Sequence, residues 1–120
     1  MRHFQQLLVW QKGMNIVAGV YAVARQLPKE ELFGLRSQLT RAAVSIPSNI
    51  AEGSSRGSAR DYKRFLEIAL GSTFEVETQL LITERIGLVS LDELTPLLSI
   101  VREEQMMLQA FMRRLEKEIQ

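Results

Sequence analysis

The chain has 120 residues, of which 46% are hydrophobic and 24% are charged, with a formal net charge of +1. These values are typical of one ordinary globular domain over residues 1–120 and argue against intrinsic disorder. The absence of cysteine excludes disulfides and cysteine-ligated metals. The sequence has no run of 18 apolar residues and no secretory leader pattern at residues 1–6. We therefore expect a cytoplasmic protein that does not enter a membrane.

The first expected helix covers residues 4–26. It ends before Pro28, because the residue that precedes a proline avoids the helical conformation. Apolar residues recur every three or four positions, which predicts an inward face. This face is formed by Leu7, Trp10, Met14, Val17, Tyr21 and Ala24. Gly13 and Gly19 would allow a neighbouring helix to approach closely.

The second expected helix covers residues 29–54, and Gly53 is placed to cap its end. Its inward face is Leu32, Leu35, Leu39, Ala42, Ala43, Ile46 and Ile50. Pro47 lies inside this helix, where it removes a backbone hydrogen bond at a cost of about 3 kcal/mol and should bend the axis. We expect Ser45, Ser48 or Asn49 to bond the freed carbonyls.

The third expected helix begins at Ser58, with Asp61 in a capping arrangement, and ends at Gly87. Its inward face is Tyr62, Phe65, Leu66, Ala69, Thr73, Val76, Leu80 and Thr83. Gly71 in its middle suggests close packing. No strand pattern occurs anywhere in the sequence.

The fourth expected helix starts either at Ser90, with Glu93 completing a capping box, or at Thr95 before Pro96. Its inward face is Leu94, Leu98, Val101, Leu108, Met112, Leu115 and Ile119, interrupted at Gln105. Four amphipathic helices with short connections predict an all-α, antiparallel up-down-up-down four-helix bundle.

Catalysis has little support in the sequence. His3 is the single histidine, and no Glu-x-x-His, Gly-x-Ser-x-Gly or phosphate-loop pattern occurs. The acids of the third helix have the spacing of a solvated face. We therefore expect no enzyme, no catalytic residue, no metal and no cofactor.

The charge is unevenly distributed. Residues 1–64 carry ten Lys/Arg and four Asp/Glu, whereas residues 65–120 carry five and ten. Six residues of the basic half are candidate phosphate contacts: Arg36, Arg41, Arg56, Arg60, Lys63 and Arg64. The alternative is that these cations pair with acids on a neighbouring helix or subunit.

The segment from Arg41 to Gly53 is apolar on more than one face, which favours burial on two sides. A second chain would provide the second burial; the alternative is a crowded core within one chain. The residues assigned to this structural motif and oligomer interface are Ser45, Ile46, Pro47, Asn49, Ile50, Glu52 and Gly53. Glu52 is expected to act structurally, through an ion pair with Arg56 or a bond to the backbone near Pro47.

Four segments resemble the four-helix bundle proteins of the 23S rRNA intervening-sequence family. These segments are Leu8–Lys12, Phe33–Leu39, Arg41–Gly53 and Tyr62–Leu66. Some members of that family are encoded within insertions of 23S ribosomal RNA genes. The related accessory variability proteins of diversity-generating retroelements form basic pentamers that are thought to bind nucleic acid and a reverse transcriptase.

The resemblance implies a left-handed bundle that assembles into a ring-like homopentamer and binds RNA, DNA or a nucleoprotein partner such as a reverse transcriptase. The first hypothesis is therefore a non-catalytic homopentamer associated with nucleic acid through its basic patch. The second is an oligomeric scaffold or protein-interaction module without a nucleic-acid role.

Overall fold

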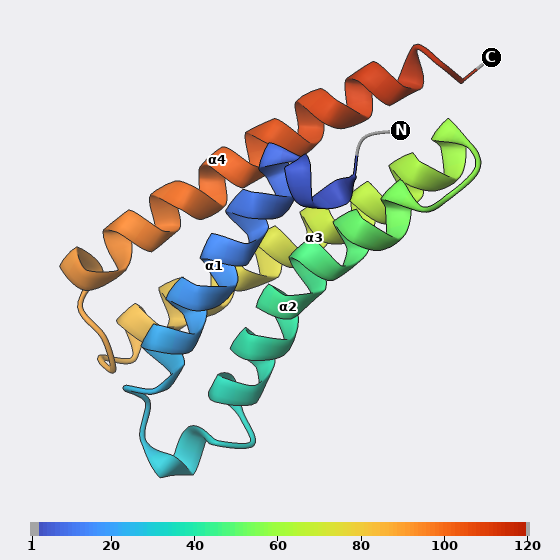
Figure 1. Ribbon diagram of the computed structural model, residues 1–120. Coiled ribbons are helices and arrows are strands. Elements are labelled where there is room, and N and C mark those ends of the chain that lie inside the picture. The colour runs from blue at the N-terminus through green and yellow to red at the C-terminus, as the bar shows by residue number, and fades with distance from the viewer. Residues whose placement is uncertain (1–2, 120) are drawn as a thin grey trace.

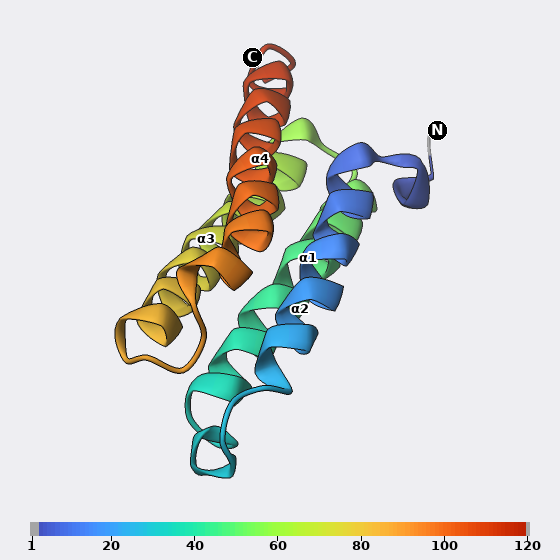
Figure 2. The ribbon, with the colours of Figure 1, turned by 90° about the vertical axis from the view of Figure 1, so that its left-hand side faces the viewer.

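The computed structural model describes residues 3–119 and contains four long helices. They are α1 (Leu8–Ala24), α2 (Leu35–Ser54), α3 (Ala59–Arg85) and α4 (Leu91–Glu116), and two short 3₁₀ turns, η1 (Phe4–Gln6) and η2 (Lys29–Glu31), precede α1 and α2. The helices lie side by side along a molecule of 48 × 23 × 22 Å (Figures 1 and 2). The α1–α2 and α3–α4 connections lie at one end, and the α2–α3 turn lies at the other (Figure 1).

Local capping determines the start of α3 and of α4. Ser58 Oγ accepts the N–H of Asp61 at 3.1 Å, and Ser90 Oγ accepts that of Glu93 at 3.2 Å. Both predicted capping serines are confirmed, and the alternative start of α4 at Thr95 is wrong, because Pro96 lies inside this helix. After α3, Gly87 adopts φ +82°, a conformation that glycine reaches without strain.

The first two helices begin later than the sequence predicted. Leu7 is extended at φ −75°, ψ 129°, so the turn at η1 does not continue into α1. Gly34, at φ −104° and ψ −109°, separates η2 from α2. Glu31 Oε1 then accepts the N–H of Leu35 at 3.1 Å, which satisfies one of the free donors at the start of α2.

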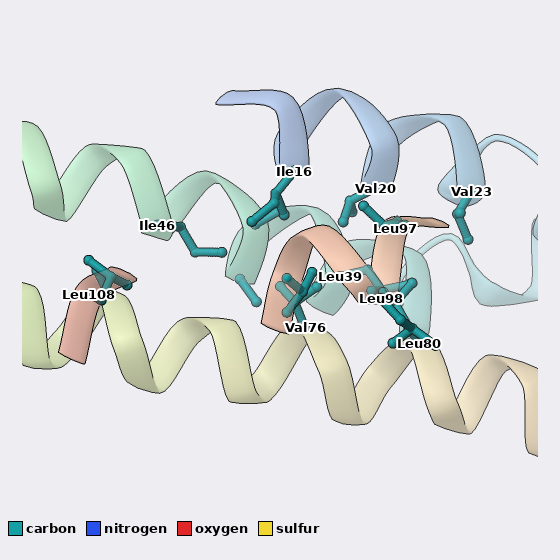
Figure 3. Close-up of a cluster of buried hydrophobic side chains, with 14 of the residues drawn as sticks. Ile16, Val20, Val23, Leu39, Ile46, Val76, Leu80, Leu97, Leu98 and Leu108 are labelled. Carbon is teal, nitrogen blue, oxygen red and sulfur yellow. The ribbon is translucent and has the colours of Figure 1, made fainter. Parts of the chain in front are cut away.

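The core runs along the centre of the molecule, where all four helices contribute buried side chains (Figure 3). The largest fully buried apolar residues are Ile16, Leu39, Ile46, Ile50, Leu66, Leu80, Leu94 and Leu108. The seven of these residues that lie in α2, α3 and α4 agree with the predicted inward faces of those helices. Such a core contributes most of the free energy of folding, at roughly 1.5–3 kcal/mol for each large side chain.

Most of the predicted inward face of the first helix is wrong, although Ala24, its last residue, is buried as predicted. The buried residues of this helix are Val9, Gly13, Ile16, Val20, Val23 and Ala24. Of the predicted face, Met14 and Tyr21 are exposed, whereas Trp10 and Val17 are half-buried. Helix α1 is apolar on two sides, so periodicity alone did not distinguish the inner side from the outer side.

Helix α2 continues through Pro47, and polar side chains reinforce the preceding turn. Asn49 Nδ2 donates to the carbonyl of Ser45 at 2.8 Å and to Ser45 Oγ at 2.9 Å. Ser72 Oγ of α3 donates to the same Ser45 Oγ at 2.8 Å. The carbonyl that a proline at position 47 leaves open is that of Ala43, so the prediction that Asn49 satisfies it is wrong.

Two glycines, Gly19 and Gly53, mark close approaches between helices. A Cβ on Gly19 would lie 2.7 Å from Leu97 Cδ1, and one on Gly53 would lie 2.9 Å from Phe65 Cβ. Gly53 therefore belongs to the α2–α3 contact inside the helix and is not its cap. The predicted close packing at Gly71 is wrong, since a Cβ there meets no atom within 4 Å.

Candidate nucleic-acid interface

Arg36 is tied to the backbone at the end of α1. Its Nε donates to the carbonyl of Ala24 and its Nη2 to that of Leu27, each at 2.9 Å. Ala24 is the last residue of α1 and Leu27 lies just beyond it, where the regular α-helical partners of carbonyl groups are missing. The guanidinium group therefore joins the end of α1 to α2, and two of its N–H groups are used in bonds within the protein.

The six candidate cations do not form one patch. Arg36 and Arg56 are 20 residues apart on one helical path, which corresponds to about 30 Å at 1.5 Å per residue. Arg41 lies between them on the exposed side of α2, without a charged partner among residues 3–119. The structure brings together the other four: Arg56, Arg60, Lys63 and Arg64, at the α2–α3 turn and the start of α3.

The aromatic ring of Phe65 organises two of these arginines. The guanidinium carbon of Arg56 lies 4.6 Å from the ring centroid, and that of Arg64 lies 5.8 Å from it. Arg56 also forms an ion pair with Glu52 at 3.0 Å, which is the pair that the sequence predicted for Glu52. Both arginines remain exposed, so their outer edges face solvent.

Lys63 is paired with two carboxylates, one of which comes from α4. Its Nζ lies 3.0 Å from Glu116 of α4 and 3.6 Å from Glu67. The hydrogen bond to Glu116 is the largest of the effects that raise the pKa of Lys63. Arg60, in contrast, is exposed and has no ion-pair partner in the described part of the chain.

The end of α4 adds cations that the sequence interpretation missed. Tyr62 packs edge-on against Phe111 at 5.2 Å, so the last turns of α4 lie beside the start of α3. Arg113 and Arg114 follow in the last turn of α4, and the guanidinium carbon of Arg114 lies 5.1 Å from the Phe111 ring. Their position between the apolar residues Met112 and Leu115, together with the predicted order of helices, was the signal available.

We call this region, residues 52–67 with 111–118, the basic end. It contains seven Lys/Arg and five Asp/Glu, so its positive excess is small. Its distinguishing property is that arginine guanidinium groups lie over aromatic rings. These groups are at one end of the molecule, next to the α2–α3 turn (Figure 2).

The motif of α2 divides between core and surface. Ile46, Pro47, Ile50 and Gly53 are buried within one chain, Ser45 and Asn49 are half-buried, and Glu52 is exposed. The oligomer-interface role assigned to Ile46, Ile50 and Gly53 is therefore wrong for this chain, because their side chains and the Gly53 backbone fill its own interior.

The outward residues of α1 and α2 instead line a shallow apolar hollow of about 370 Å³, which we call the outer groove. Its lining is Trp10, Met14, Val17, Val44, Pro47, Ser48 and Ala51. A second hollow of about 470 Å³ is lined by other parts of the same two helices and by the η2 segment, where the Phe33 side chain is 92% exposed.

Within the described residues, no group of three His, Cys, Asp or Glu side chains is arranged to hold a metal ion. None of the helices in that range is long and apolar enough to cross a membrane.

Four packed helices without strands in residues 3–119 define an all-α protein of the four-helix class. The model of the 23S rRNA-intervening sequence protein family matches residues 5–110, and the chain belongs to that family. A similar solved structure is a protein with unknown function from the S23 ribosomal protein family of Bacteroides thetaiotaomicron. It is 22% identical with a TM-score of 0.82, over 88% of this chain and 98% of that one. No curated protein matches the chain.

Proposed function

We propose that this protein is a non-catalytic nucleic-acid-binding protein that contacts phosphates through the basic end. The observation that carries the proposal is the clustering of Arg56, Arg60 and Arg64 on one exposed surface. Guanidinium groups that lie over an aromatic ring retain donors for phosphate oxygens, and the free N–H groups at the start of α3 add to them. The family name points to an association with RNA genes.

The proposal includes the assembly. We infer a left-handed, up-down-up-down antiparallel bundle that forms a ring-like homopentamer, with the outer groove as part of the contact between chains. The groove supports this because Met14 and Val44 expose apolar surface on adjacent helices, beside the half-buried Trp10. Contiguous exposed apolar surface of this kind marks interaction sites.

The second candidate is an oligomeric scaffold that binds protein instead of nucleic acid, with a reverse transcriptase as one partner that the resemblance suggests. Two observations favour it. The positive excess of the basic end is small, and Lys63 and Arg56 are already paired with carboxylates. A scaffold would use the exposed apolar hollows as its docking surface.

The deciding experiment is fluorescence anisotropy of a labelled RNA hairpin and a labelled DNA duplex over a salt series. The native protein should bind with an affinity that falls steeply with salt. The triple variant R56Q/R60Q/R64Q should bind more weakly, and its salt slope should be shallower by about 2–3, corresponding to three lost phosphate contacts.

The matched control is R25Q/K29Q/R85Q, which removes three exposed cations from the opposite end of the molecule. It should retain native affinity and slope. Equal weakening by the two triple variants would show that only overall charge matters and would contradict the assignment to the basic end. No binding by the folded native protein at low salt would favour the scaffold.

Assembly is measured by light scattering. Five copies of 13.7 kDa would give about 68 kDa, and V44E, which places a charge in the outer groove, should reduce the mass. M106E is the control, because Met106 is 69% exposed on α4 and lies outside the groove. A native mass near 13.7 kDa would contradict the proposed ring assembly, and the binding experiment would still test the basic end separately.

A further inference from the structure

One ionisable side chain lies completely inside the molecule. Glu104 of α4 has no exposed surface, and neither of its carboxyl oxygens accepts a hydrogen bond from a donor in the described chain. Burial raises the pKa of Glu104 to about 8, so this carboxyl carries its hydrogen at neutral pH. A neutral carboxyl has an O–H group, and a buried O–H group requires an acceptor.

The Glu104 side chain extends from α4 across the core to Gly13 of α1 and toward α2. A Cβ built on Gly13 of α1 would be 3.3 Å from Glu104 Oε2, 3.3 Å from Ile46 Cγ2 and 3.5 Å from Pro47 Cβ. The carboxyl, the glycine of α1 and the proline of α2 therefore surround one small region of the core. Gly13 leaves the space that the carboxyl group occupies.

The same region contains a backbone acceptor without its regular donor. Pro47 has no N–H, so the carbonyl of Ala43, four residues earlier, loses its helical hydrogen bond. Ala43 is fully buried, which keeps water from replacing that bond. The nearby side-chain amide of Asn49 donates to Ser45 and not to Ala43.

No cation neutralises Glu104. Lys12 of α1 is the charged group whose field lowers the pKa of Glu104, yet its Nζ is bound to Glu103 at 2.9 Å. The buried faces of α2 and α3 carry no ionisable side chain in the described part of the chain. On the α3 side, Glu77 is held by Arg102 at 2.9 Å and by Gln105 at 2.8 Å.

We propose that Glu104 is a proton-dependent clasp, whose neutral carboxyl donates its O–H to the Ala43 carbonyl that Pro47 leaves open, and so ties α4 to α2 beside Gly13. When the proton leaves, the donor is lost and a negative charge remains next to a carbonyl oxygen. Helix α4 then loosens from α1 and α2 at this level. A proline inside a helix leaves a carbonyl without its donor, and a neutral acid inside a core has a donor that needs an acceptor. The clasp satisfies both groups with one hydrogen bond.

The test is an NMR titration of ¹³C-labelled native protein from about pH 5 to about pH 9, a range that extends well above ordinary glutamate pKa values. The side-chain carboxyl carbon of Glu104, assigned by its absence in E104Q, should titrate near pH 8. The backbone carbonyl carbon of Ala43 should shift with the same midpoint. Titration of Glu104 together with the exposed carboxyls, or an Ala43 signal that stays constant, would overturn the proposal.

A second measurement uses the urea midpoint at both ends of that pH range. The native midpoint should fall at the alkaline end, and E104Q, whose amide still donates a hydrogen bond, should remove that fall. The control E103Q changes the exposed neighbouring carboxyl and should keep it. An undiminished fall in E104Q would refute the clasp; if E104Q does not fold, the native titration, assigned from backbone connectivity, decides the matter.

Discussion

Replacing Arg36 tests whether this residue supports the fold or binds phosphate. Its guanidinium group donates two hydrogen bonds of 2.9 Å to the carbonyls of Ala24 and Leu27. Hydrogen bonds from charged groups contribute about 1.5–3 kcal/mol each, and water would recover part of this at a half-buried site. We therefore expect R36A to lower the free energy of unfolding by about 2–3 kcal/mol, and R36K, which can keep one bond, by about half as much.

The assay is urea unfolding followed by circular dichroism, with R41A as the control. Arg41 is on the same helix, but it is exposed and has no ion-pair partner within residues 3–119, so R41A should change the free energy of unfolding by less than about 0.5 kcal/mol. R36Q should also retain the RNA affinity of the native protein. A stability loss in R36A no larger than that in R41A would refute the structural role.

Three further predictions concern stability. G53A should lower the free energy of unfolding by about 1–3 kcal/mol, because the new Cβ would lie 2.9 Å from Phe65 Cβ; a neutral result would contradict the close α2–α3 contact. G71A should raise it by about 0.5–1 kcal/mol, since a methyl group there meets no atom, and thermal melts of both variants measure these changes. The pKa of Glu104 is about 8 in the folded chain against 4.5 as its ordinary value. Stability should therefore be highest below pH 4.5 as far as this group is concerned, and fall by up to about 5 kcal/mol as pH rises through 8; urea unfolding across this range checks the sign.

Much of the fold could be predicted because local signals and the apolar pattern agreed. Ser58, Ser90 and Gly87 are caps whose chemistry is local, so three helix ends were placed correctly. Helix α1 was assigned the wrong inner face because Val9 and Ile16 on one side compete with Trp10 and Met14 on the other. Only the packing of neighbouring helices distinguishes the two sides.

The candidate site was predicted less completely, since charge along a sequence does not reveal which cations are already paired. From the sequence, Lys63 and Arg60 were equally good candidates for contacting phosphate. In the structure, Lys63 forms an ion pair with Glu116 from the far end of the chain. Arg114 joins the basic end only through the packing of α4 on α3, shown by the contact of Tyr62 with Phe111. The burial of the Glu104 side chain was not predicted, because this residue lies within an otherwise regular amphipathic repeat.

The contact of Lys63 with Glu116 has a practical consequence for labelling. It places the last turn of α4 beside the basic end, and the ring of Phe4 on Trp10 places the first described residues at that same end of the molecule (Figure 1). A fluorescent protein or affinity tag fused at either position would therefore crowd the surface under study. Because the chain contains no cysteine, one introduced in the 86–90 connection would be a unique attachment point for a dye, at the opposite end of the bundle.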